Sequence, residues 1–278
     1  MATSNALPTK ESDATLLPVL EELALSAGRA ILKIRDEGVS VDIKADASPV
    51  TRADREAERI ILEGLTRHFP AVPIVAEEEA SAGRLPETLG EAFFLVDPLD
   101  GTKEFVKGNT DFTVNIALIR RGAPEIGVVH APARGVLYSG CHEGASSIDI
   151  SSEGVPAGRR PIAVRSPSTP LTVVASRSHR TRETDDYLAK CPGAEVLSVG
   201  SSLKFCMLAA GMADLYPRFG RTMEWDTAAG DAILRASGGV TNTVDGKPLV
   251  YGKRCQKDDV DFANPWFIAT ASSAFGFA

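Results

Sequence analysis

The sequence predicts a layered α/β (α+β) fold with mixed sheets and two packed halves. Stretches with apolar residues at helical spacing alternate with short apolar or β-branched runs along the whole chain. Three successive runs in the first half, separated by glycine or proline, are typical of an antiparallel meander. Such alternation builds sheets that are covered by helices. The 278 residues, 44% of them hydrophobic, are enough to bury a core in one large domain or two smaller ones.

The first half, residues 13–142, is expected to begin with a long helix after a flexible polar N-terminus at 1–12. Leucine, isoleucine and alanine recur every three or four residues from Asp13 onward, which predicts an amphipathic helix. The helix should end near Gly38, because glycine commonly follows the last helical turn. Residues 39–44 then alternate as a short strand.

A second helix is predicted by a capping box. Thr51 and Asp54 are three residues apart, and the helix should run to His68. Residues 73–76 form a brief strand that ends in three glutamates, Glu77–Glu79. A run of glutamates is usually a solvated edge, but the position at the end of an apolar strand suggests that one of them turns inward.

The stretch AFFLVDPLDGTKEF, residues 92–105, is the centre of the first half. An apolar strand ends in Asp97 and Asp100, and Gly101 allows a tight turn that leaves room for a ligand. Two carboxylates this close repel each other unless a cation lies between them, and hard oxygen ligands suit Mg²⁺. A solvated acidic turn is the alternative explanation.

Strands of the meander are predicted at 112–120, 125–131 and 135–141. Residues 143–170 are rich in Ser, Gly, Pro and Arg and form the expected linker between the two halves.

The second half, residues 171–278, again alternates strands with helices. Gly200, Ser201 and Ser202 open a helix whose first turn holds Lys204, which is a favourable place for an anion, although a serine cap explains it as well. Asp226 lies at the start of a helix that runs to Ala236, where the helix dipole stabilises a carboxylate. Strands are expected at 171–175, 195–199, 213–218, 240–244 and 266–269.

Composition excludes several classes of protein. The formal net charge is −7, and no block of Lys and Arg indicates a nucleic-acid polymer as partner. The four cysteines lie far apart without CxxC pairs, which disfavours zinc sites and disulfides and suits a reducing compartment. The N-terminus lacks a secretory pattern, and no run approaches the ~18 apolar residues of a membrane span. We expect a cytoplasmic protein, and a peripheral association with membranes stays open.

Four carboxylates, those of Glu77, Asp97, Asp100 and Asp226, each stand at the end of an element, where layered folds gather functional groups. Together with the backbone carbonyl of Leu99 and the hydroxyl of Thr102 they offer the acidic cage that two Mg²⁺ ions need. Because Mg²⁺ completes its octahedron with substrate phosphate, such a cage indicates phosphoryl chemistry. Backbone N–H groups of Gly101 and Thr102 would form an anion-binding turn for that phosphate.

These motifs resemble the lithium-sensitive, Mg²⁺-dependent phosphatases that include inositol monophosphatase. The resemblance rests on DPLDGT at 97–102 and WDTAAGDAIL at 225–234, preceded by the acidic run at Glu77, and it covers almost the whole chain. It implies an αβαβα sandwich of the sugar phosphatase type. Ala76 stands where relatives commonly have Gly or Ser, so Glu78 is the alternative metal ligand if the register differs.

Within that family the chain is similar to the 3′(2′),5′-bisphosphate nucleotidases. The similarity lies in KEF after the first motif and in SRSH at 176–179, GSSLKF at 200–205 and LYPRFG at 215–220. It implies a small nucleotide bisphosphate as substrate. The residues expected beside that substrate are Gly101, Thr102, Lys103, Glu104, Asp226, His179 near the base, and Ser201, Lys204 and Arg218 on the retained phosphate.

The resemblance implies hydrolysis by direct attack of water without a phosphoenzyme. One Mg²⁺ would be held by Glu77, Asp97 and the Leu99 carbonyl, and Glu77 with Thr102 would orient the water. A second ion, held by Asp97, Asp100 and Asp226, would stabilise charge on the leaving 3′ oxygen. Asp54 and Lys44 could belong to an outer shell for a third ion, although the helix cap suffices for Asp54.

Three alternatives stay open: an inositol or sugar monophosphatase with the same metal core, an inactive nucleotide-binding regulator, and a structural protein whose acidic turns are only caps. The sequence does not decide between a monomer and a homodimer, nor whether a sulfated nucleotide is preferred.

Overall fold

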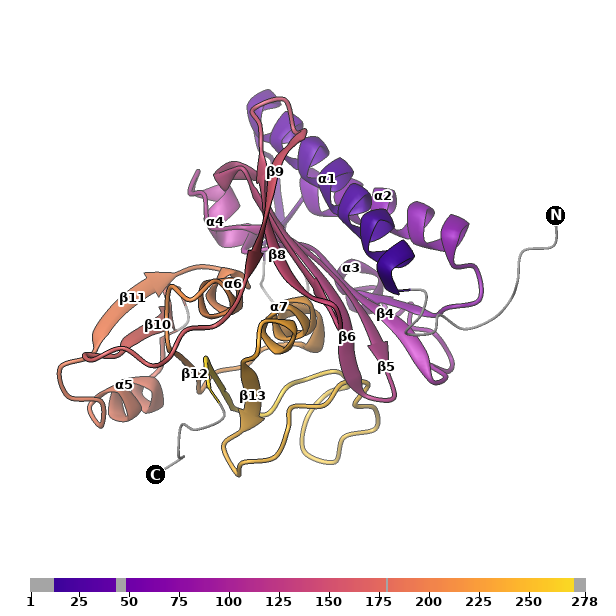
Figure 1. The fold of residues 1–278 in the computed structure, drawn as a ribbon. Coiled ribbons are helices and arrows are strands. Elements are labelled where there is room, and N and C mark those ends of the chain that lie inside the picture. The colour runs from indigo at the N-terminus through magenta and orange to yellow at the C-terminus, as the bar shows by residue number, and fades with distance from the viewer. Residues whose placement is uncertain (1–12, 44–48, 179, 273–278) are drawn as a thin grey trace.

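The computed structural model describes residues 13–43, 49–178 and 180–272 (Figure 1). Its helices are α1 (Asp13–Glu37), α2 (Arg52–His68), α3 (Glu77–Ser81), α4 (Thr102–Val106), α5 (Arg182–Leu188), α6 (Leu203–Ala209) and α7 (Glu224–Ala236), with a 3₁₀ turn η2 (Pro132–Arg134). Its strands are β1 (Val41–Ile43), β2 (Pro49–Thr51), β3 (Ile74–Ala76), β4 (Ala92–Asp100), β5 (Thr113–Arg120), β6 (Ala123–Ala131), β7 (Val136–Cys141), β8 (Gly144–Ile150), β9 (Pro156–Ile162), β10 (Thr172–Ser176), β11 (Glu195–Val199), β12 (Leu215–Arg218), β13 (Val240–Thr243) and β14 (Phe267–Thr270).

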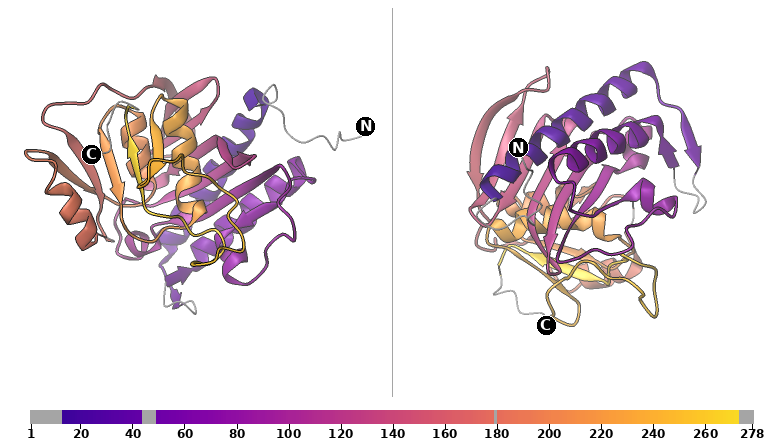
Figure 2. Two further views of the ribbon diagram at one scale, coloured as in Figure 1. Left: turned by 90° about the horizontal axis from the view of Figure 1, so that it is seen from below. Right: turned by 90° about the vertical axis from the view of Figure 1, so that its right-hand side faces the viewer.

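These elements form five layers, which confirms the predicted αβαβα sandwich. Helices α1 and α2 cover one face of a seven-stranded sheet, and α6 and α7 separate its other face from a five-stranded sheet. Helix α5 packs against the five-stranded sheet from outside. Figure 2 shows the N-terminal helices on one side of the large sheet and the C-terminal half on the other. None of the described helices is both long and apolar enough to cross a bilayer.

The large sheet contains the predicted meander. Its strand order is β3-β4-β5-β6-β7-β8-β9, with β3 parallel to β4 and the other neighbours antiparallel. The small sheet has the order β11-β10-β12-β14-β13, in which β11, β10 and β12 are parallel and the last two pairs are antiparallel. Both sheets are therefore mixed, as the sequence predicts.

The segment 143–170, expected as a linker, contains two strands of the large sheet, because β8 and β9 occupy half of it. Strand β9 is an edge strand, and its residues 156–161 are all exposed. An exposed edge strand needs no apolar alternation, so its Gly, Pro and Arg content resembles that of a loop. The chain crosses to the second sheet only after Ile162.

Small residues let α7 lie unusually close to the large sheet. A Cβ atom on Gly127 of β6 would stand 2.2 Å from the Ala229 carbonyl oxygen of α7, and one on Gly140 of β7 would stand 3.0 Å from the Ile233 Cα. The alanines and glycine of the WDTAAGDAIL motif therefore have a packing function besides any functional one. This contact holds the N-terminus of α7, and with it Asp226, against the end of the sheet.

We predict that Gly127→Ala destabilises the protein by about 1–3 kcal/mol, because the added methyl group forces α7 away from β6. Gly158→Ala on β9 is the matched control, since the nearest atom to its new Cβ lies 3.8 Å away. Urea unfolding of both variants measures the difference. Equal stability of the two would show that the spacing between helix and sheet is not tight.

A buried histidine on β6 makes the stability of the fold depend on pH. His130 is 2% exposed, and its Nδ1 lies 3.0 Å from the carbonyl oxygen of Ala24 in α1. Burial lowers the pKa of His130 to about 4, although the hydrogen bond to Ala24 opposes the shift. The unfolded chain therefore binds the proton at a higher pH than the folded protein does.

Because the folded pKa of His130 lies below the unfolded value of 6.5, its contribution to stability is complete above pH 6.5 and is lost as the pH falls toward 4. The loss should reach up to about 3 kcal/mol. We expect His130→Gln to flatten the dependence of the unfolding free energy on pH in this window. A His130→Gln curve parallel to that of the parent protein would refute this.

Candidate active site

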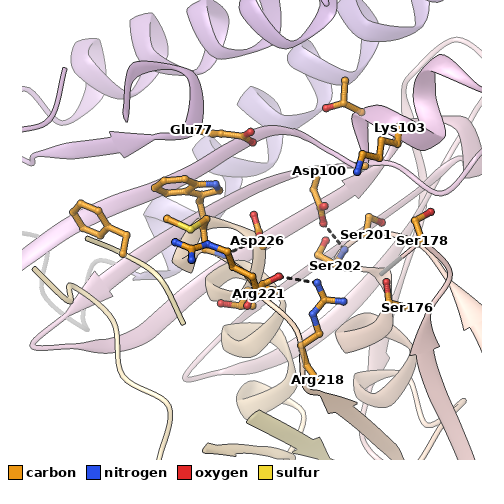
Figure 3. A pocket seen from close by; sticks show the side chains of 18 of the residues that line it. Glu77, Asp100, Lys103, Ser176, Ser178, Ser201, Ser202, Arg218, Arg221 and Asp226 are labelled. Atoms are coloured by element: carbon orange, nitrogen blue, oxygen red, sulfur yellow. Dashed lines mark hydrogen bonds between the residues drawn. The ribbon is translucent and has the colours of Figure 1, made fainter. Parts of the chain in front are cut away.

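A pocket of about 850 Å³ lies where the two halves meet. Figure 3 shows acidic side chains at one end of it and serines with an arginine at the other. The walls come from α3, the end of β4, α4, the turn before α6, β12 and the start of α7. Among the predicted site residues, the lining includes Glu77, Asp100, Gly101, Thr102, Lys103, Glu104, Ser201, Lys204, Arg218 and Asp226.

Strand β4 carries Asp97, Leu99 and Asp100. Asp100 lines the pocket, whereas Asp97 and Leu99 are buried and are not among its lining residues. The pairing of β4 with β5 is regular up to Asp97 and shifts before Asp100, where the Pro98-Leu99 pair bends the strand. The Asp97 Oδ1 atom accepts a hydrogen bond from the Leu99 N–H at 3.0 Å. Gly101 then has φ 94°, and a Cβ there would stand 2.9 Å from the Asp111 carbonyl oxygen. Glycine is therefore required at the turn that precedes α4.

The three glutamates of α3 have different surroundings. Glu58 of α2 is buried, and its carboxylate accepts the backbone N–H groups of Glu78 at 2.9 Å and Glu79 at 3.1 Å. Glu79 turns outward to Arg84, 2.7 Å away. Glu77 is the glutamate of the run that lines the pocket, and Figure 3 shows it facing the space near Asp100 and Asp226.

Glu58 was not anticipated from the sequence, where it reads as a helix residue among apolar neighbours. Burial raises the pKa of Glu58 to about 7, and the charges of Glu78 and Glu79 add to the shift, while the two N–H donors oppose it. The position of Glu58 on the inner face of the predicted helix could have revealed this contact. A carboxylate that is buried there needs hydrogen-bond donors from another part of the chain. The function of Glu58 is to cap α3 and so to fix Glu77 at the edge of the pocket.

The carboxylates at the acidic end of the pocket repel one another, and burial together with this repulsion raises the pKa values of the aspartates. Burial raises the pKa of Asp97 well above its usual range, and the charges of Glu77, Asp100 and Asp226 raise it further. Burial likewise raises the pKa of Asp226 to about 8, with contributions from Asp100 and Glu77. The pKa of Asp100 is raised by burial too, although Lys204 opposes the shift. The four predicted carboxylates thus act on one another, as a shared site requires.

This oxygen-rich set fits Mg²⁺ by its donor chemistry. In the described part of the chain, no three His, Cys, Asp or Glu side chains are grouped closely enough to hold an ion as they stand. The carboxylates instead satisfy protein donors: Asp100 Oδ2 accepts the Ser202 N–H at 2.6 Å, and Asp226 Oδ2 accepts the Met223 N–H at 2.8 Å.

Thr102 and Asp54 form a pair at the acidic end. The Thr102 hydroxyl lies 2.9 Å from Asp54 Oδ1 and 3.2 Å from the Leu99 carbonyl oxygen. The predicted capping box of α2 is confirmed, because Asp54 Oδ2 also accepts the Thr51 N–H at 2.7 Å. Asp54 therefore touches Thr102 directly, a contact that the sequence did not indicate. Lys44, its expected companion in an outer metal shell, lies outside the described residues.

The opposite end is cationic and hydroxyl-rich. Lys204 is 4% exposed and Arg218 is 7% exposed, and the Arg218 Nη2 atom donates to the Arg221 carbonyl at 2.8 Å. Burial lowers the pKa of Lys204 to about 8, and Asp100 opposes that shift. The Ser201 Oγ atom is buried and has no hydrogen-bond partner within the parts of the chain that the structure describes. Predicted His179 lies outside those parts.

Two residues that follow the first motif differ in their surroundings. Lys103 is exposed at the rim of the pocket. Glu104 is buried, and its carboxylate is held by protein donors, Asn109 Nδ2 at 2.6 Å and the Ser178 hydroxyl. The structure therefore gives Glu104 a contact with the SRSH segment, and its expected contact with a substrate stays a prediction.

Comparison with known sequences agrees with this arrangement. A profile of the inositol monophosphatase family matches residues 12–271. The 3′(2′),5′-bisphosphate nucleotidase CysQ of Escherichia coli strain K12 is 45% identical over 248 residues, which cover 88% of this chain and 96% of that protein. CysQ of Salmonella typhimurium strain LT2 is 44% identical over 251 residues, covering 90% and 97%.

Solved structures share the fold. A crystal structure of CysQ from Bacteroides thetaiotaomicron, described as a bacterial member of the inositol monophosphatase family, superposes with a TM-score of 0.74 at 37% identity and covers 92% of this chain and 97% of its own. An inositol monophosphatase from Anabaena sp. PCC 7120 gives a TM-score of 0.69 at 28% identity, covering 94% and 92%.

We predict that Asp97→Asn stabilises the protein in the presence of a chelator by about 1–3 kcal/mol at pH 8, because one buried, repelled carboxylate is removed. In excess Mg²⁺ the parent protein should gain stability by mass action and the variant should gain much less. Thermal unfolding with and without Mg²⁺ measures both effects. Asp149→Asn, at a half-exposed ion pair on β8, is the control. An equal Mg²⁺ response in the Asp97 variant would contradict the proposed ligand set.

Proposed function

The chain belongs to the inositol monophosphatase family, and from that premise we propose that it is a Mg²⁺-dependent 3′(2′),5′-bisphosphate nucleotidase. It is a phosphoric monoester hydrolase that acts on a small nucleotide and removes the 3′-phosphate of adenosine 3′,5′-bisphosphate to leave AMP. The relatives named nucleotidases align over almost their whole length, which supports this activity over that of an inositol phosphatase.

The observation that carries the proposal is the division of one pocket into an acidic end and a basic end. The acidic end, with Glu77, Asp100 and Asp226, suits metal ions and the phosphate that is cleaved. The basic end, with Lys204 and Arg218, suits a second phosphate that is retained. A second phosphate would place an additional anionic group beside these two buried cations, which a substrate with a single phosphate does not offer. A bisphosphate satisfies both ends.

We assign the ions to the predicted ligands: one to Glu77, Asp97 and the Leu99 carbonyl, and a second to Asp97, Asp100 and Asp226. When bound, Mg²⁺ supplies Lewis-acid activation of water and neutralises charge on the phosphate and the leaving oxygen. A third ion is not part of the proposal, because the Asp54 carboxylate already accepts hydrogen bonds from Thr51 and Thr102.

The residues of the chain direct the water. Because the Thr102 hydroxyl donates to Asp54, its oxygen keeps a lone pair that can accept a hydrogen bond from one O–H of the attacking water. Glu77 would accept the hydrogen bond from the other O–H and take that proton as general base. The backbone N–H groups at the start of α4 orient the phosphate for in-line attack. The water oxygen forms a bond to phosphorus as the bond between phosphorus and the 3′ oxygen breaks. The 3′ oxygen takes a proton from a solvent water molecule, and AMP and inorganic phosphate leave. We expect no phosphoenzyme, because no histidine base accompanies Thr102 in the motif and its hydroxyl is held by Asp54 and the Leu99 carbonyl oxygen.

The central test is phosphate release from the purified protein in Mg²⁺. We expect kcat/KM for adenosine 3′,5′-bisphosphate to exceed that for inositol 1-phosphate at least tenfold. Preference for the inositol ester would favour the monophosphatase alternative, and no release from either ester would favour the inactive nucleotide-binding regulator. Inclusion of the sulfated nucleotide in the comparison measures a preference that the site geometry leaves open.

We predict that Arg218→Gln lowers kcat/KM for the bisphosphate about 10- to 100-fold, which corresponds to the ~1.5–3 kcal/mol of a charge-assisted hydrogen bond. Adenosine 3′-monophosphate, which lacks the second phosphate, should be hydrolysed with nearly unchanged efficiency. The exposed Arg121→Gln, in an ion pair with Glu91, serves as the control. Equal losses on both substrates would contradict the assignment of Arg218 to the second phosphate.

A further inference from the structure

A buried carboxylate outside the metal motif connects the two halves beside the basic end. Asp111 lies between α4 and β5 and is 1% exposed. Its Oδ1 atom accepts the Arg134 Nε–H at 2.9 Å. Its Oδ2 atom accepts the backbone N–H of Gly200 at 3.1 Å and lies 2.6 Å from Arg177 Nη1. One side chain of the first half therefore holds two segments of the second.

Arg177 extends this network. Its Nη1 atom lies 3.7 Å from Glu104 Oε2, and its Nη2 atom donates to the Ser198 carbonyl at 3.1 Å. The Arg177 backbone N–H also donates to the Val199 carbonyl at 3.3 Å. The strand β11 that leads to Gly200 is thus tied to Arg177, and Arg177 is tied to the two buried carboxylates.

The turn Gly200–Ser202 is anchored at both of its ends. Asp111 accepts the Gly200 N–H, and Asp100 accepts the Ser202 N–H at 2.6 Å. Between the anchors Ser201 has φ 49°, a left-handed conformation that non-glycine residues rarely adopt and that the surroundings must enforce. The Ser201 carbonyl accepts a hydrogen bond from the ammonium group of Lys204.

The contact between Asp111 and the turn is close as well as polar. A Cβ atom on Gly200 would stand 2.8 Å from both the Cβ and the carbonyl oxygen of Asp111, and 3.3 Å from the Glu104 Cγ. Glycine at this position lets the turn approach the first half. The backbone shape that displays Ser201 and Lys204 therefore depends on what Asp111 holds.

We propose that Asp111 is a positioning residue for the basic end of the site: it fixes the turn Gly200–Ser202 so that Ser201 and Lys204 face the second phosphate of the substrate. The identity of that ligand rests on the proposed function, whereas the anchoring of the turn does not. Arg134 and Arg177 hold the carboxylate in place, and Arg177 links it to the SRSH segment.

The Asp111 charge matters for this function. Burial opposes its ionisation, but the Gly200 N–H and the guanidinium groups of Arg134 and Arg177 outweigh burial and lower the pKa of Asp111. The ionised group has two acceptor oxygens, of which one serves Arg134 and the other serves Gly200 and Arg177. Asparagine has the same size but only one acceptor oxygen. It can therefore accept hydrogen bonds either from Arg134 or from Gly200 and Arg177, but not from both groups.

Hydrogen exchange followed by peptide mass spectrometry tests the anchoring without reference to activity. In Asp111→Asn, peptides that cover residues 195–206 should exchange at least threefold faster, while peptides of α7 exchange at the parent rate. Asp149→Asn on β8 is the matched control. Unchanged exchange at 195–206 would overturn the proposal, and so would faster exchange over the whole chain, because the residue would then be a general stabiliser.

Kinetics test the consequence. Asp111→Asn should raise KM for adenosine 3′,5′-bisphosphate about tenfold with kcat within twofold of the parent value, and leave kcat/KM for adenosine 3′-monophosphate unchanged. Asp111→Glu, which keeps both acceptors, should recover part of the lost affinity. A fall in kcat on both substrates would overturn the proposal. Should Asp111→Asn fold poorly, Arg177→Gln removes one exposed partner of the network and should show the same split between KM and kcat, to a smaller degree.

The two claims fail separately. A parent protein that does not prefer the bisphosphate to the monophosphate would refute the proposed function, and the exchange experiment would still decide whether Asp111 anchors the turn. A clear bisphosphate preference together with unchanged exchange and kinetics in the Asp111 variants would refute the positioning function alone.

Discussion

The repulsion among four clustered carboxylates, of which Asp97 is buried and the others are partly buried, is the constraint on which the rest of the structure depends. Glu77, Asp97, Asp100 and Asp226 come from three separate parts of the chain. Burial raises the pKa values of the three aspartates, and the charges of neighbouring carboxylates in this set raise them further. No folded protein gains stability from such a cluster alone. A divalent cation bound among these carboxylates would offset their repulsion. The surrounding fold must then hold the four side chains close together.

That task is met by packing and by backbone anchors. Gly127 and Gly140 allow α7 to pack closely against the large sheet. This packing fixes the position of Asp226, which lies in the first turn of α7. Glu58 caps α3 and fixes the register of the neighbouring glutamate. Asp100 contributes twice, since it belongs to the acidic end and also accepts the N–H of Ser202 from the basic end. The position of the metal motif and the position of the phosphate turn are therefore coupled through one side chain.

Much of this was accessible from the sequence. Periodicity, caps and the two motifs predicted the layers, the meander, the span of α7 and the acids that line the pocket. Strand β9 was missed because an exposed edge strand carries no apolar alternation. The pair formed by Asp54 and Thr102 and the network around Asp111 were missed for another reason: each joins residues far apart in the chain, and a single sequence does not show which polar side chains meet after folding.

The most direct measurement of the central claim is anomalous diffraction from crystals equilibrated with Mn²⁺ in place of Mg²⁺. The account predicts at least one ion at the acidic end of the pocket, about 2.0–2.3 Å from the oxygens of one of the two assigned ligand sets. These sets are Glu77, Asp97 and the Leu99 carbonyl for one ion, and Asp97, Asp100 and Asp226 for the other. Strong anomalous density elsewhere, with the acidic end free of any ion at saturating Mn²⁺, would contradict it.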